Sequence, residues 1–161
     1  MLGKTHLAGG LAAATVICHV SQFPIIDGLV FIAGCAVGSL IPDIDHKSSI
    51  IGKKVKPVST VISMTTKHRT LFHWFAPYCL LAAAIHYWRP DWDLATLSVL
   101  IGILTHIGLD ALNPAGVPFF PGIKLHLAKI RTGSKLDKSL GILLSLLATG
   151  SFLYWIIGLI S

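Results

Sequence analysis

Five apolar runs separated by short polar segments dominate the pattern of this 161-residue chain. The runs cover residues 5–20, 25–41, 71–88, 94–112 and 139–160. Each approaches the length of about 20 residues that an α-helix needs to cross a bilayer, and the first two are the shortest. The pattern predicts an all-α, polytopic membrane helix bundle with about five transmembrane helices. The length indicates a single domain, residues 1–161.

The composition strengthens the membrane interpretation. Hydrophobic residues make up 53% of the chain and charged residues only 12%, whereas a soluble domain carries about 25% charged residues. These values exclude a water-soluble globule and a disordered chain. The three cysteines all lie inside apolar runs without a CxxC pattern, which favours packing roles over disulfides. Gly34 and Gly38 form a GxxxG pattern that predicts a close helix–helix contact.

The cations are distributed unevenly about the predicted spans. If all five runs cross the membrane, Arg89 is the single cation among 13 lysine and arginine residues that falls on the side opposite the N-terminus. Cytoplasmic loops are enriched in Lys and Arg, so the cation-rich side is predicted to be cytoplasmic, with the N-terminus inside and the C-terminus outside. Lysines beside a membrane attract anionic lipid headgroups, so we expect membrane lipids as partners. The basic loops have no interleaved aromatic residues, so nucleic acid is not an expected partner.

Histidines and aspartates gather on the same predicted side as the cations. His106 and Asp110 are four residues apart and therefore share one helix face. Ionisable residues inside membrane segments indicate function, and imidazole with carboxylate suits Zn²⁺, with Mn²⁺ or Fe²⁺ as alternatives. We predict a divalent metal site at the cytoplasmic helix ends, with room for two or more ions. The candidate ligands are His6, Asp43, Asp45, His46, His68, His73, His106 and Asp110. The guanidinium group of Arg69, next to His68 in the sequence, is suited to bidentate hydrogen bonds with phosphate oxygens.

These same residues resemble the YdjM-like family of membrane-bound metal-dependent hydrolases. The likeness rests on Thr5-His6, Pro42-Asp-Ile-Asp-His46, His68-Arg69 with His73, and His106-Ile-Gly-Leu-Asp110 followed by Asn113-Pro-Ala-Gly116. The resemblance implies a small bacterial inner membrane protein with metal-dependent hydrolase activity. It also implies a distant similarity to zinc-dependent phospholipase C and P1-type nucleases, which are helical phosphoesterases with His/Asp multi-zinc sites. This chain differs from them in having no glutamate.

Three functions are consistent with such a site. The first is hydrolysis of a lipid or headgroup phosphoester at the cytoplasmic face, with Asp45 orienting or deprotonating water and Arg69 stabilising charge on the phosphoryl oxygens. A metal transporter is disfavoured because residues 8–18, 28–42, 74–85, 95–105 and 140–160 contain neither a charged residue nor histidine. A membrane scaffold holding a structural metal is the third. The loop 113–122 either dips into the interface or forms a rigid turn. Substrate, metal number and oligomeric state stay open.

Overall fold

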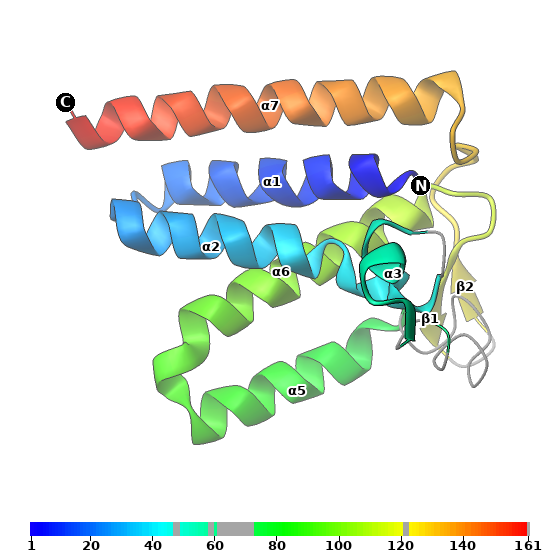
Figure 1. Ribbon diagram of the computed structural model, residues 1–161, viewed down its shortest axis with the longest axis horizontal. Coiled ribbons are helices and arrows are strands. Elements are labelled where there is room, and N and C mark those ends of the chain that lie inside the picture. The colour runs from blue at the N-terminus through cyan, green and yellow to red at the C-terminus, as the bar shows by residue number, and fades with distance from the viewer. Residues whose placement is uncertain (47–48, 58–59, 61–72, 121–122, 161) are drawn as a thin grey trace.

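The computed structural model describes residues 1–46, 49–57, 60, 73–120 and 123–160. The chain is mostly helical, as predicted, and Figure 1 shows three long helices lying along one another and two inclined to them. The five long helices fall on the five apolar runs: α1 (Gly3–Val20), α2 (Ile25–Gly38), α5 (Phe75–Trp88), α6 (Asp93–Ala111) and α7 (Lys135–Ile160). The apolar runs in the sequence therefore located each long helix to within about four residues.

Three helical stretches of the described chain have the length and apolar composition of a membrane span. They are Ile25–Asp45, Pro90–Ala111 and Lys135–Ile160. At about 1.5 Å per residue, the 14 described residues of α5 span about 21 Å, short of a hydrocarbon core of about 30 Å. The sequence predicted about five spans, and the described helices support three of them on length and composition.

Short elements connect the long helices at one end of the bundle. A 3₁₀ turn, η1 (Ile41–Asp45), follows α2 and carries Pro42 in its first turn, where a proline needs no amide hydrogen. The short helix α3 (Ile50–Lys54) comes next, and another 3₁₀ turn, η2 (Pro90–Trp92), precedes α6. Helix α2 ends at Gly38, earlier than the apolar run, because the chain tightens into η1.

One element departs from the all-helical prediction. Strands β1 (Val117–Phe120) and β2 (Ile123–Leu125) form an antiparallel pair in which Val117 faces Leu125. Val117 is buried against Ile103, Ile107 and Ala111 of the last turns of α6. Cross-strand pairing, together with packing on α6, turns this part of the predicted loop into a hairpin.

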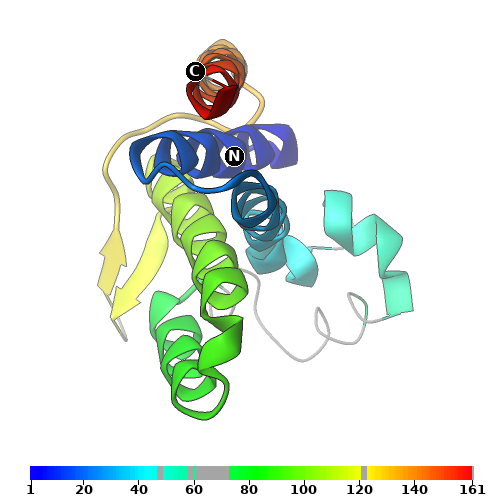
Figure 2. The same cartoon turned by 90° about the vertical axis from the view of Figure 1, so that its left-hand side faces the viewer.

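Helix α1 lies between α7 on one side and the α2–α6 pair on the other, as the two views of Figures 1 and 2 agree. The GxxxG pair makes the predicted close contact, and its partner is α6. A methyl group at Gly34 would stand 1.8 Å from Ser98 Oγ, and one at Gly38 would stand 2.1 Å from the Val99 carbonyl oxygen. No side chain fits at either distance, so glycine here lets the two backbones approach.

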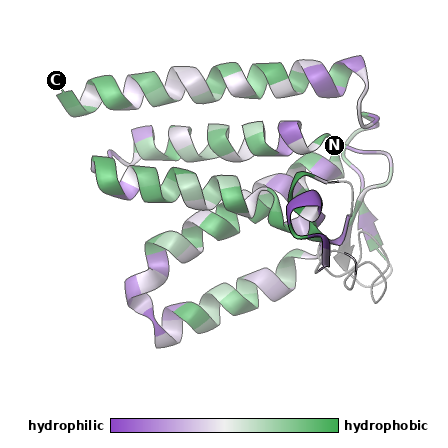
Figure 3. Cartoon of the chain, in the orientation of Figure 1, coloured by the Kyte–Doolittle hydropathy of each residue, from purple (hydrophilic) through white to green (hydrophobic). Residues whose placement is uncertain are grey.

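The apolar core lies between the long helices, and polar residues gather near one end of the bundle. Cys18 and Cys35 are buried as free thiols in a cluster with Ala14, Phe31 and Trp155, which joins α1, α2 and α7. Figure 3 shows the long helices coloured mostly hydrophobic, with hydrophilic colour in α3 and near the start of α7. The candidate site lies at this end of the bundle, where α1 begins and α6 ends (Figure 1).

Candidate metal centre

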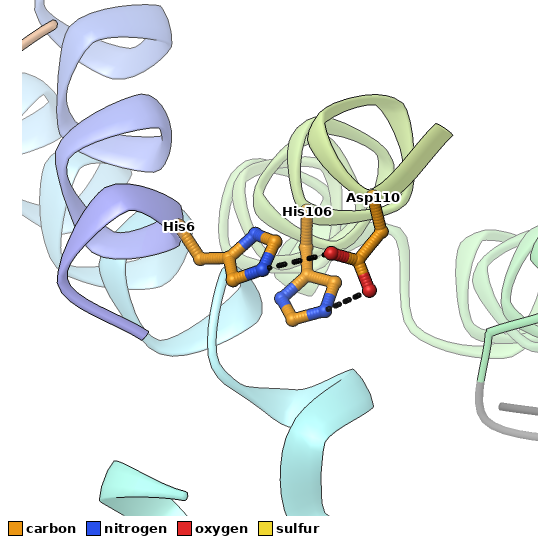
Figure 4. A group of neighbouring side chains, drawn as sticks. All are labelled: His6, His106 and Asp110. Carbon is orange, nitrogen blue, oxygen red and sulfur yellow. Dashed lines mark ion pairs between the residues drawn. The ribbon is translucent and has the colours of Figure 1, made fainter. Parts of the chain in front are cut away.

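Four separate segments bring His and Asp side chains to one end of the bundle. His6 lies in the first turns of α1, and His106 and Asp110 lie in the last turns of α6, on one face as predicted. Asp43 comes from η1, and His73 precedes α5 by two residues. Figure 4 shows His6, His106 and Asp110 with their polar atoms directed toward one another.

The carboxylate of Asp110 is the centre of this cluster. Its Oδ1 lies 3.1 Å from Nε2 of His6, and its Oδ2 lies 3.4 Å from Nε2 of His73 and 3.9 Å from Nε2 of His106. Asp43 Oδ1 lies 3.8 Å from the same nitrogen of His106. The α-amino group of Met1 also donates to Asp110 Oδ1, so a positive charge is already stabilised at this carboxylate.

These separations are compatible with ligands of one shared ion. Two ligand atoms about 2.1 Å from an ion in tetrahedral geometry lie about 3.4 Å apart. The distances of 3.1 to 3.9 Å bracket that value, and the longer ones exceed hydrogen-bond range. Two sets of three ligand atoms could hold an ion: His6 with His106 and Asp110, and Asp43 with His73 and His106.

A backbone carbonyl orients His106 for this role. Nδ1 of His106 donates to the carbonyl oxygen of Ser39 at 2.7 Å, because a carbonyl can only accept. The lone pair is therefore on Nε2, which faces the carboxylates and has no hydrogen-bond partner among the described residues. Metal-binding histidines commonly make this second hydrogen bond, which sets the tautomer and the ring plane.

Burial leaves several polar atoms of this cluster without hydrogen-bond partners among the described residues. His6, His73 and His106 are fully buried, and Asp110 is 1% exposed. The rings of His6 and His106 stack with their centroids 3.6 Å apart, and within the described part of the chain Nδ1 of His6 has no hydrogen-bond partner. A buried polar atom without a partner is unfavourable by about 1–3 kcal/mol. Coordination of a divalent cation would satisfy several such atoms at once.

His106 belongs to both ligand sets, which limits the number of ions that the two sets can bind. Its Nδ1 is engaged by Ser39, so one nitrogen of this ring remains for an ion. The two sets therefore describe alternative or combined ligands for one ion. A second ion would need ligands from other predicted residues.

The structure brings together five of the eight predicted ligands. Asp45 is buried at the end of η1, and His46 follows it with an exposed side chain; neither belongs to the two ligand sets. Asp45 lies within electrostatic range of the Tyr78 hydroxyl of α5. His68 and Arg69 lie outside the described residues, so their predicted roles stay predictions.

Two contributors were missed by the sequence analysis. The Ser39 carbonyl could not be found from residue type, since any residue has one. Asp137 is fully buried at the start of α7 and accepts hydrogen bonds from Leu2 N, Thr5 Oγ1 and Gly133 N at 3.1, 2.8 and 2.7 Å. It thereby ties the start of α1, which carries His6, to α7. The spacing Ser134-x-x-Asp137 before an apolar run is a helix-start signal that marks this position.

Fold and site together define a helical membrane protein with a buried His/Asp cluster of metal-ligand geometry. The model of the YdjM inner membrane protein family matches residues 1–160, and the chain belongs to this family. It is 35% identical over 137 residues to "Uncharacterized protein YvsG" of Bacillus subtilis (strain 168), covering 83% of each chain. It is 30% identical over 125 residues to "Inner membrane protein YdjM" of Escherichia coli (strain K12), covering 73% of this chain and 64% of that protein. No solved structure matches the chain significantly.

Proposed function

We propose that this inner membrane protein is a metal-dependent hydrolase that cleaves a phosphoester of a lipid or lipid headgroup. The observation that carries the proposal is the convergence of His6, His106 and Asp110, with Asp43 and His73 beside them, at one helix end. Zn²⁺ is the cation best suited to three imidazoles and two carboxylates, with Mn²⁺ as the alternative. A bound divalent cation would polarise a phosphoryl oxygen and activate water for attack on phosphorus.

The protein's own groups have distinct tasks in this proposal. The cation would be held by three ligands, either His6, His106 and Asp110 or Asp43, His73 and His106, which leaves a position open for water. The Ser39 carbonyl keeps His106 in the ligating tautomer. Asp45, two residues beyond Asp43, orients the attacking water and accepts its proton. Arg69 binds the phosphoryl oxygens in a bidentate manner, which supports the charge that develops there.

The position of the cluster supports a substrate held at the membrane surface. The five residues lie near one end of the long helices. In a bilayer spanned by α2, α6 and α7, this end would lie near the phospholipid headgroups. Asp43 has the most exposed side chain of the five, 17%, so substrate approaches from the η1 side. We infer that this side is cytoplasmic, because the cations cluster on it.

The proposed topology keeps five crossings with the N-terminus inside. Three exposed aromatic residues at the opposite end of the bundle support a membrane crossing by α5. Around the α5–α6 turn, the exposed fractions of Tyr87, Trp88 and Trp92 are 80%, 74% and 54%. Tyr and Trp are enriched where a membrane protein meets the interface. Arg89 at this turn pairs with Asp91 at 2.9 Å and lies over the Trp92 ring, which neutralises the single cation on this side.

The test measures metal content per chain by inductively coupled plasma mass spectrometry on detergent-purified protein. We expect about one equivalent of Zn²⁺ or Mn²⁺ in the wild type, and a large loss in His106→Ala and Asp110→Asn. His86→Ala is the matched control, because His86 is exposed at the opposite end. The same preparations are then assayed on phosphomonoester and phosphodiester lipids in mixed micelles, where hydrolysis should follow metal content.

The burial of the cluster favours one competing function. The four most buried ligands are at most 1% exposed, which is typical of a closed structural metal site in a non-catalytic membrane protein. Stoichiometric metal without hydrolysis of either ester class would favour this second function. Absence of metal after incubation with Zn²⁺ and Mn²⁺ would contradict both.

A further inference from the structure

A hollow of about 510 Å³ lies between the first turns of α1 and the N-terminal half of α7, apart from the histidine cluster. Figures 1 and 2 show α7 lying along α1 with the rest of the bundle on the far side of α1. The outer face of this pair is therefore open. The hollow is lined by Lys4 and Thr5 of α1 and by Lys138, Ile142, Ser145 and Leu146 of α7, and it extends to Thr149.

Two cations stand at one end of this hollow. Lys4 and Lys138 come from different helices and are both exposed. The seven aspartates of the chain all belong to the described residues, and within these residues neither lysine forms an ion pair. The adjacent Asp137 points inward, where three donors occupy its carboxylate. The two ammonium groups are thus available to a ligand from outside the chain.

Beyond the two lysines, the wall of the hollow that α7 forms is apolar. Ile142 and Leu146 are 63% and 64% exposed along it. The two hydroxyl side chains bond to their own helix: Ser145 Oγ donates to the Gly141 carbonyl at 2.8 Å, and Thr149 Oγ1 to the Ser145 carbonyl at 2.9 Å. Their donor groups are therefore satisfied, and the surface they present beyond the lysines is hydrocarbon-like.

We propose that this hollow binds one anionic phospholipid, with its phosphate between Lys4 and Lys138 and an acyl chain along α7 toward Thr149. The polarity changes along the helix axis in the same order as in a phospholipid, from charged headgroup to chain. A free phosphate ion would leave the apolar wall unused, and an apolar protein helix would leave the two lysines unpaired. This inference does not depend on hydrolysis at the histidine cluster.

The test compares two lipids with identical palmitoyl and oleoyl chains, phosphatidylglycerol and phosphatidylcholine, by native mass spectrometry of the detergent-purified full chain. Each lysine beside an anionic headgroup strengthens binding about fivefold, so the pair predicts a preference for phosphatidylglycerol of about thirtyfold. The Lys4→Ala/Lys138→Ala variant should bind both lipids nearly equally. The matched control is Lys124→Ala/Lys129→Ala, which removes the same charge from exposed positions outside the hollow and should keep the preference.

A second pair of variants tests the apolar part. Ser145→Trp fills the hollow and should weaken binding of both lipids, whereas Leu143→Trp, on an exposed face of α7 outside the hollow, should not. Equal binding of the two lipids by the wild type would overturn the proposal. So would an equal loss of preference in both lysine pairs, or unchanged phosphatidylglycerol binding in Ser145→Trp. The assay involves no turnover, so its outcome is independent of the hydrolase proposal.

Discussion

Replacing Asp137 tests whether the start of α1 is held in place through α7. The Asp137 carboxylate accepts three hydrogen bonds at 2.7 to 3.1 Å, from Leu2, Thr5 and Gly133. A hydrogen bond to a charged group contributes about 1.5–3 kcal/mol. Taking the lower end because two of the three bonds are part-buried, we expect Asp137→Ala to lower the free energy of unfolding by about 4.5 kcal/mol. Asp137→Asn keeps one oxygen acceptor and should lower it by about 1–2 kcal/mol.

The assay is unfolding in a series of dodecyl sulfate mole fractions, followed by circular dichroism. Asp27→Asn is the control, because Asp27 is exposed on α2 and should change stability by less than about 0.5 kcal/mol. Metal affinity is the second readout, since His6 directly follows Thr5 and is displaced if this tie is lost. Asp137→Asn should therefore bind metal more weakly than wild type while remaining folded. Stability of Asp137→Ala within about 0.5 kcal/mol of wild type would refute this account.

Three further outcomes follow from the packing and the site. In Gly38→Leu the Cβ alone would stand 2.1 Å from the Val99 carbonyl oxygen, so we expect the α2–α6 contact to be lost. The variant should be protease-sensitive and should aggregate on size-exclusion chromatography. Metal affinity should fall as the pH is lowered, because protons compete with the ion for the imidazole nitrogens; an affinity that does not change with pH would argue against ligation by histidine. Asp43→Ala should weaken metal affinity about tenfold or more, whereas Asp45→Ala should retain metal and lose hydrolysis. Loss of metal in Asp45→Ala with retention in Asp43→Ala would show that the proposed roles of the two aspartates are exchanged.

Sequence reasoning located the long helices and one of their contacts. Apolar runs of near-membrane length specify helices wherever they occur, because an unpaired backbone is too costly in lipid. The glycines at 34 and 38 mark a close approach because they carry no side chain, and the structure identifies α6 as the partner. The hairpin was missed because its strands are short, and because Val117 is held by packing on α6, a contact that residue type does not show.

The sequence by itself determined which residue types could bind a cation and which end of the bundle they occupy. The i, i+4 spacing of His106 and Asp110 is a property of one helix, so it was readable directly. Only the tertiary structure decided which partners join them, because His6, Asp43 and His73 arrive from three other segments whose positions depend on helix packing. The same holds for the Ser39 carbonyl and for Asp137, whose roles come from what each contacts across the bundle. Residue chemistry and spacing are local, whereas a ligand cluster is a property of how helices cross.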